Sequence, residues 1–351
     1  DPVVAARPGV AALPDARTRE SASGRERVLS GVARTSLNPA MSNRRAVWSW
    51  ALYDLANTIF YGVVVTGYLP SYVIDGLCGG EHAPFALAFY PAMILAGLVS
   101  PALGETADAR GVSKRATLIA TFACVAATLA LPLWSSPGPL LATFACALFS
   151  YQSALVFYNA LLPTVADARV EGAVSGLGTG LGYLGNVLAL PLAMALVARF
   201  DGDARPAFVL AGVLFLVFTF PFARFVPEGR ARAAADDPAP RRPSLTRTLE
   251  LLRSVRGRKG LLAYFAGNFL CSDVLGSVYA YLVPFLKSPQ GLGVESAIAV
   301  LFAINVVAVP TCVVMGRMSD RLGAKRMSIV GAIALGVAIT LAHCVAERAR
   351  A

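Results

Sequence analysis

Nine long apolar stretches, each near the length that crosses a lipid bilayer, constrain this chain more than any other feature. A membrane-spanning helix needs about 20 mostly apolar residues, because lipid offers no hydrogen-bond partner and only a complete helix satisfies its own backbone. The chain is 56% hydrophobic and 15% charged, whereas a soluble domain carries about 25% charged residues. We therefore predict an all-α membrane protein. The expected spans are 46–74, 85–103, 116–134, 140–165, 174–197, 207–226, 261–286, 297–314 and 327–345.

Basic residues are distributed unequally between the predicted loops. The loops after the second, fourth, sixth and eighth spans carry eighteen Lys and Arg residues when Arg224 at the end of the sixth span is included, and the alternate loops carry three. Since cytoplasmic loops are enriched in Lys and Arg, this places the N-terminus and the basic loops in the cytoplasm. The net charge of +10 is thus explained by topology, and we expect no nucleic-acid partner.

The chain divides into four predicted parts. Residues 1–43 are expected to be a disordered N-terminal segment. Residues 1–40, which are rich in Arg, Ala, Ser and Pro, are either part of that disorder or upstream of a natural start at Met41. Residues 44–226 hold six spans, 227–259 form a cytoplasmic linker, and 260–351 hold three more. Within the linker, leucines at helical spacing follow Ser244, which predicts either a short helix on the membrane surface or a plain solvated linker.

A repeated loop relates the two halves. GETADARGVSKR begins at Gly104 and GRMSDRLGAKR begins at Gly316, 212 residues later. In both copies Gly is followed at +4 by Asp and at +7 by Gly, and basic residues close the loop, as a tight hairpin at an anionic membrane surface requires. A generic basic turn would not predict equal spacing in both. The gating-loop candidates are Gly104, Asp108, Gly111, Arg115, Gly316, Asp320, Gly323 and Arg326.

This duplicated pattern resembles the cytoplasmic loop signature of the major facilitator superfamily. WSWALYDLANTIF from Trp48, FYNALLPTVAD from Phe157 and SGLGTGLGYLGN from Ser175 resemble the branch of vacuolar amino-acid effluxers and their bacterial relatives. The resemblance implies a major facilitator fold of two six-helix bundles around a central cavity. It also implies export or exchange of a small solute, an amino acid being the expected one.

The resemblance also implies a role for the loop aspartates, each bracing the start of a helix in the other half. Asp320 would meet the start of the fifth span near Ser175, and Asp108 would need an eleventh span. The family has twelve spans where nine are predicted here, so we expect a fragment or a truncated reading frame with the C-terminal three helices missing.

Polar residues inside the predicted spans are the candidates for a substrate or coupling-ion site, because carboxylates in lipid are costly unless they face a cavity or a partner. Asp273 lies about 18 Å into its span, with Asn268 on a neighbouring arc. Asp54 shares a helical face with Asn57 and Tyr61, and serves either the cytoplasmic gate or an interfacial cap. Three further residues serve either the cavity or helix-to-helix hydrogen bonds: Gln152, Asn159 and Asn305.

Three function classes fit these patterns: a secondary transporter, an intramembrane lipid-modifying enzyme, and a truncated non-transporting remnant. The second class needs clustered carboxylates or a Ser/His pair at depth, and the sequence shows no such cluster. We expect no enzyme activity, cofactor or metal. The expected partners are the bilayer and a small-molecule substrate, with possible coupling to protons, and a monomer is favoured. The uncleaved first span favours a bacterial inner membrane over a vacuolar membrane.

Overall fold

The computed structural model describes residues 44–229, 259–287 and 293–348. The disorder expected before residue 44 and the surface helix expected near Ser244 lie outside the described residues. Helices and turns account for the described part of the chain, without a strand. The elements are α2 (Arg44–Ile59), η1 (Phe60–Tyr68), α3 (Leu69–Ser71), η2 (Tyr72–Leu77), α4 (Ala83–Arg110), α5 (Ser113–Ala130), η3 (Leu131–Leu133), α6 (Pro137–Ala160), α7 (Leu162–Val165), α8 (Glu171–Arg199), α9 (Arg205–Phe225), α11 (Lys259–Lys287), α12 (Val294–Leu322) and α13 (Ala324–Arg348).

Six helical stretches among the described residues are long and apolar enough to cross a membrane. They are α4, α5 through η3, α6 through α7, α8, α9 and α12. The expected spans at 46–74, 261–286 and 327–345 are also helical, but they are not among these six. The protein is therefore an all-helical, multi-pass membrane protein, and the prediction of nine spans is supported for six.

The first segment departs from a regular α-helix. From Phe60 to Tyr68 and again from Tyr72 to Leu77 it is a wider π-helix, in which, for example, the Leu69 N–H donates to Val64 O five residues back. Pro70 follows directly, and its ring clashes with the carbonyl four residues earlier in an α-helix. The wider helix relieves that clash. π-Helical stretches are often found at functional sites.

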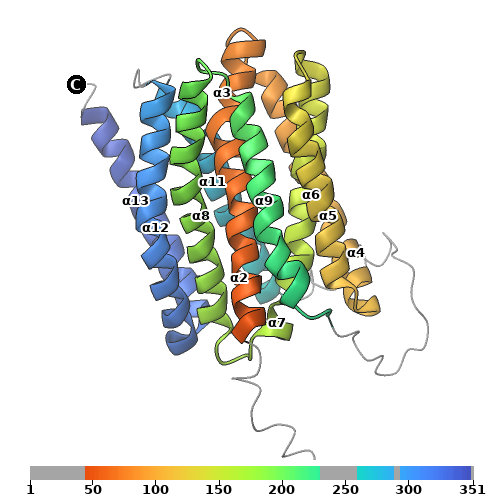
Figure 1. The fold of residues 1–351 in the computed structure, drawn as a ribbon. Helices are drawn as coiled ribbons and strands as arrows, with labels where there is room; N and C mark the ends of the chain where they lie inside the picture. The colour runs from red at the N-terminus through yellow and green to blue at the C-terminus, as the bar shows by residue number, and fades with distance from the viewer. Residues whose placement is uncertain (1–43, 230–258, 288–292, 349–351) are drawn as a thin grey trace, which may run out of the picture. The chain divides into compact units, whose positions relative to one another are not determined.

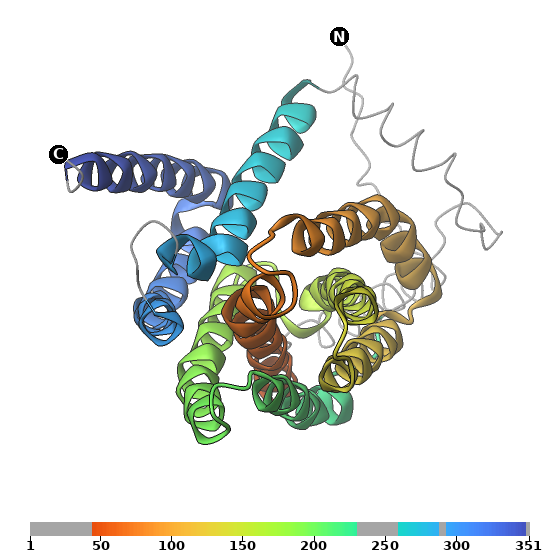
Figure 2. The ribbon, with the colours of Figure 1, turned by 90° about the horizontal axis from the view of Figure 1, so that it is seen from above.

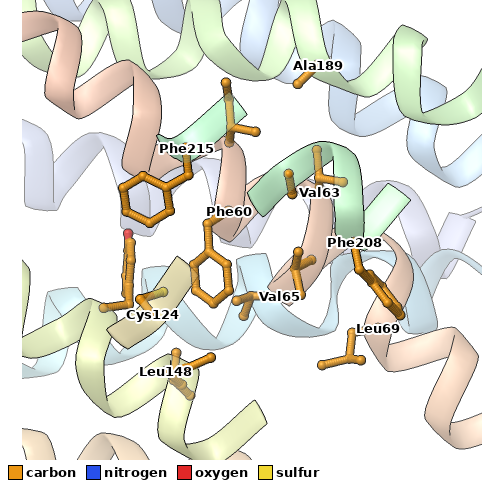
Figure 3. Close-up of a cluster of buried hydrophobic side chains, with 14 of the residues drawn as sticks. Phe60, Val63, Val65, Leu69, Cys124, Leu148, Ala189, Phe208 and Phe215 are labelled. Atoms are coloured by element: carbon orange, nitrogen blue, oxygen red, sulfur yellow. The ribbon is translucent and has the colours of Figure 1, made fainter. Parts of the chain in front are cut away.

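The first segment is also the centre of the packing. α2 contacts both α8 and α9, and Figure 2 shows it between them. Phe60 and Val63 are fully buried and pack with Phe208 and Phe215 of α9 in the core drawn in Figure 3. Tyr53 adds a hydrogen bond of 2.5 Å to Thr121 Oγ1 of α5. Helices α5, α6, α8 and α9 thus surround the segment that carries Asp54.

The repeated loops are shorter than predicted, because the preceding helices continue through most of the motif. α4 runs to Arg110 and α12 to Leu322, so Gly104 and Gly316 lie inside helices. Only the second glycine of each copy makes the turn. Gly111 has φ of 64° and Gly323 has φ of 89°, which is the left-handed region where a side chain is disfavoured.

Candidate functional site

Helix α8 presents glycines to two different neighbours. Gly176 faces α12, where an added Cβ would lie 2.6 Å from Cys312 O and 2.8 Å from Gly316 Cα. Gly182 faces α2 instead, where a Cβ would lie 2.6 Å from Thr58 Oγ1. Small residues let membrane helices approach backbone to backbone. The Gly-rich run of α8 therefore packs against α2 on one side and against α12 on another. α8 and α12 lie side by side in Figure 1.

Asp320 joins α12 to the start of α8. Its Oδ1 accepts a hydrogen bond from the Gly172 N–H at 2.9 Å, and its Oδ2 accepts one from the Ala173 N–H at 2.7 Å. The first N–H groups of a helix lack internal partners and carry partial positive charge, so a carboxylate stabilises them. Asp320 was expected to meet the start of this helix near Ser175, and its two partners, Gly172 and Ala173, lie three and two residues before Ser175. We call this end of the bundle, which carries Arg110, Arg115, Arg224 and Arg326, the basic end.

The first copy of the loop is held differently. Asp108 accepts a hydrogen bond from Ser113 Oγ at 3.3 Å, so it closes its own hairpin. The N–H groups of Lys114 and Arg115 at the start of α5 donate instead to Glu228 Oε1, at 2.7 and 3.3 Å. Arg115 Nε also lies 3.6 Å from Glu228 Oε2. Glu228 was not predicted from the sequence, and its position just past the end of α9 gave no signal.

The two caps occupy the same helical positions. Val112 and Val170 are the N-cap residues of α5 and α8, and neither helix receives a hydrogen bond from its own N-cap side chain. In both helices the second and third residues donate their N–H groups to one acidic side chain from elsewhere in the chain, Glu228 or Asp320. The starts of α5 and α8 are thus each fixed by a distant carboxylate.

A second polar contact joins α8 and α12 deeper in the bundle. Asn186 Nδ2 donates to Asn305 Oδ1 at 3.0 Å, and Asn305 Nδ2 donates to Leu301 O at 2.7 Å. Both asparagines are buried. A Cβ at Gly62 of η1 would overlap the Asn186 side chain, so three elements meet at this point. Asn186 was not singled out in the sequence, although an amide within an apolar run was a signal for it.

Asp54 lies in a compact group on the other face of α8. Asn57 Nδ2 donates to Asp54 Oδ1 at 3.1 Å. A Cβ at Gly178 would lie 3.4 Å from Asp54 Oδ2, 3.3 Å from Tyr158 Oη and 2.9 Å from Trp50 Cζ3. Trp50 stacks on Tyr158 with ring centroids 4.4 Å apart, and its Nε1 donates to Tyr158 O at 3.2 Å. Asp54 and the Tyr158 hydroxyl therefore face the same glycine.

Tyr158 Oη has no hydrogen-bond partner within the described part of the chain, although it is buried. Asn186 Oδ1 and Thr66 Oγ1 of η1 are in the same condition. Buried polar atoms without a partner are costly, because they lose water and gain nothing in exchange. Such atoms beside the first segment indicate where a solute, water or proton would find a hydrogen-bond partner.

The remaining predicted site residues are dispersed. Tyr61 stacks on Tyr151 of α6 at 5.7 Å, and Gln152 Nε2 donates to Met93 Sδ at 2.8 Å between α6 and α4. Asn159 is exposed at the end of α6. Asp273 and Asn268 lie on α11, but their side chains are outside the part that the structure describes. The described contacts thus bring Asp54 and Asn57 together and leave Gln152, Asn159 and Asn305 elsewhere.

A metal centre is not visible in the ranges with described side chains, where no group of three or more His, Cys, Asp or Glu residues converges. The described cysteines, at positions 78, 124, 146, 271 and 312, are free thiols. Among the described side chains, the groups packed within the bundle thus include amides, hydroxyls, thiols and the Asp54 carboxylate.

Comparison with known proteins agrees with this architecture. The chain is 25% identical over 302 residues to the uncharacterized MFS-type transporter YxiO of Bacillus subtilis, covering 81% of this chain and 70% of that protein. It is 28% identical over 202 residues to the multidrug efflux pump Tap of Mycolicibacterium fortuitum, covering 54% of this chain and 46% of Tap. These relatives do not test the narrower likeness to the branch of vacuolar effluxers, which stays a prediction.

The fold also matches a solved transporter structure. Superposition on the nucleoside transporter NupG gives a TM-score of 0.53 at 16% identity, covering 78% of this chain and 64% of that one. The likeness is one of fold, and the chain spans less than two thirds of NupG. The model of the Major Facilitator Superfamily matches residues 171–346, the region that holds α8, the Asp320 cap and the Asn186–Asn305 contact. The chain belongs to the Major Facilitator Superfamily.

Proposed function

We propose that the protein is a secondary transporter of a small solute, working by alternating access between the half at 44–226 and the half that begins at residue 260. The observation that carries this proposal is the cap that Asp320 of α12 places on Gly172 and Ala173 of α8. It is a contact between halves, it lies at one end of the bundle, and it can break without unfolding either helix. Such a contact suits a gate.

The cap and the deeper Asn186–Asn305 hydrogen bond have different roles in this proposal. Charge-assisted hydrogen bonds are strong, but an exposed one is readily replaced by water, and Asp320 is exposed. The buried amide pair cannot exchange its partner for water. We propose that the halves separate at the basic end and remain in contact near Asn186.

Asp54 is the proposed coupling group. Its carboxylate lies within the helix packing beside Asn57, and its second oxygen faces Gly178 together with Tyr158 Oη. A carboxylate there can be neutral or charged depending on its access to water, which is what proton coupling requires. Asp273 and Asn268, on α11, stay candidates for the substrate site on sequence grounds.

The proposed solute is small and polar, with amino acids first on the list because the motifs at Trp48, Phe157 and Ser175 resemble amino-acid effluxers. Relatives named for multidrug efflux and nucleoside transport make lipophilic cations and nucleosides the comparison classes. A bacterial inner membrane is the proposed location, since the relatives described above with a named source are bacterial.

The test is counterflow in proteoliposomes that contain the purified protein. Vesicles loaded with one class of unlabelled solute are diluted into the same labelled solute, and accumulation above protein-free vesicles shows carrier activity. Asp54→Asn should retain counterflow but lose accumulation driven by a pH gradient, because exchange does not require net proton movement. Absence of counterflow for amino acids, nucleosides and lipophilic cations alike would contradict the proposal.

A further inference from the structure

An apolar groove lies on the outside of the bundle between α5 and α9. It has a volume of about 430 Å³ and is lined by Phe122, Leu216, Val217, Thr219, Phe220 and Ala223. The Thr219 hydroxyl already donates to Phe215 O of its own helix at 2.7 Å. The groove therefore offers carbon surface and no free polar group. Its volume falls in the range of about 300 to 1,000 Å³ that small-molecule sites occupy.

The groove is on the lipid-facing side of two helices that cross the membrane. Phe220 is 69% exposed, Val217 56% and Phe122 48%, and α5 and α9 both meet the length and hydropathy of a span. A polar solute would find no partner in such a site. An acyl chain of the surrounding bilayer would cover the same carbon surface without desolvating anything.

Charge distinguishes one end of the groove from the other. On α9, Leu216, Phe220 and Arg224 follow each other at four-residue spacing, so Arg224 continues the lining face toward the basic end. On α5, Arg115 precedes Phe122 by seven residues and lies on the same face at the same end. Glu228, just past the end of α9, contacts the start of α5 and so links the two helices that line the groove.

The charges at this corner do not cancel. The Arg224 guanidinium is exposed and lies 5.4 Å from the Phe225 ring centroid. Among the described residues, the ion pair at this corner is the one between Arg115 and Glu228. The other acidic residues here are Asp108, which is hydrogen-bonded to Ser113, and Glu105, both on α4. Among the described residues of this corner, four basic side chains thus meet three acidic ones, which leaves a surplus of positive charge. The basic residues are Arg110, Lys114, Arg115 and Arg224.

We propose that this groove is a binding site for an anionic phospholipid. One acyl chain lies along Phe122, Val217 and Phe220, and the headgroup phosphate lies at Arg224, with Arg115 beside it. Basic residues at the cytoplasmic end of spaces between membrane helices are suited to anionic headgroups. The proposal depends on the membrane location of the chain and not on the proposed transport.

The headgroup part of the proposal is tested with phosphatidylglycerol and phosphatidylethanolamine of identical acyl chains. Binding of each lipid to the purified protein in detergent is measured by native mass spectrometry. Arg224→Gln should weaken phosphatidylglycerol binding roughly fivefold, as about 1 kcal/mol per basic residue implies. It should weaken phosphatidylethanolamine binding less, because the ammonium group of that lipid offsets the charge of its phosphate. Arg169→Gln, which removes an exposed charge before α8, is the matched control and should change neither.

The acyl-chain part is tested by filling the groove. Val217→Trp should reduce retention of both lipids, whereas Val209→Trp, on α9 and also exposed at 41% but outside the groove, should not. Both side chains are on the outer surface, so neither replacement disturbs the core. Equal weakening of phosphatidylglycerol binding by Arg169→Gln and Arg224→Gln would show diffuse attraction and overturn the proposal, as would unchanged lipid retention in Val217→Trp.

Discussion

Asn186 of α8 and Asn305 of α12 share a buried hydrogen bond of 3.0 Å, between residues 119 positions apart in the chain. The exposed fractions of the two side chains are 1% and 0%. Both side chains are shielded from bulk water, and the Asn305 amide is oriented by its second bond to Leu301 O. This pair therefore defines the register of α8 against α12.

A double-mutant cycle on this pair should show energetic coupling. Asn186→Ala and Asn305→Ala remove the same interaction, and hydrogen bonds between membrane helices contribute about 0.6 kcal/mol on average and up to about 1.7. We expect a coupling within that range in the free energy of unfolding, measured by SDS titration in mixed micelles. Asn57→Ala with Asn305→Ala, residues with separate partners, should be additive. Additivity in the first pair would show that the bond does not hold the helices together.

Gly62→Ala should destabilise the protein through the same contact. The added methyl group would overlap the Asn186 side chain, and a buried overlap typically costs about 1 to 3 kcal/mol. Asn186→Ala in the same chain should restore part of the loss by vacating the space. Gly97→Ala on α4 is the control, because a Cβ there meets nothing within 4 Å. Similar losses from Gly62→Ala and Gly97→Ala would contradict the contact.

Asp320→Asn should loosen the contact between α8 and α12 at the basic end. The neutral amide is a weaker acceptor for the Gly172 and Ala173 N–H groups. Cys312 lies in this seam, with its carbonyl 2.6 Å from a Cβ placed on Gly176. In a variant that keeps Cys312 as its one cysteine, we expect maleimide labelling in membranes to become several-fold faster.

Asp108→Asn is the matched control for that experiment. It is the equivalent aspartate of the first loop copy, and its described partner is Ser113 of its own hairpin. It should leave the labelling rate of Cys312 unchanged. Equal acceleration by the two variants would mean that labelling reports general loosening and not the cap on α8.

Glu228→Ala should destabilise the protein more than Arg115→Ala. Glu228 accepts from two N–H groups at the start of α5, and loss of a helix cap costs about 0.5 to 2 kcal/mol. Arg115 contributes only an ion pair in which its side chain is 79% exposed, and such pairs contribute little. Thermal unfolding at low and high salt separates the two effects. The reverse ranking would show that the ion pair outweighs the cap.

Hydropathy and loop spacing were sufficient to predict the helical membrane fold and the family. The repeat at Gly104 and Gly316 was recognisable because helix turns impose local requirements on Gly and Asp. Glu228 and Asn186 were missed because each acts on a partner more than 100 residues away. Their partners depend on which helices become neighbours, and a local pattern, such as the amide of Asn186 within an apolar run, does not identify the partner. The π-helix that begins at Phe60 was also not predicted, although Pro70 follows it in the sequence.

The separation of α8 from α12 at the basic end can be measured directly by double electron–electron resonance between two spin labels. Labels at Arg169→Cys and Arg321→Cys, both exposed, report on the loop before α8 and the last turn of α12 when the native cysteines are replaced. We expect two distance populations in the reconstituted protein, with the longer one enriched by Asp320→Asn. A single distance, unchanged in Asp320→Asn and by any transported solute, would contradict a gate at this seam.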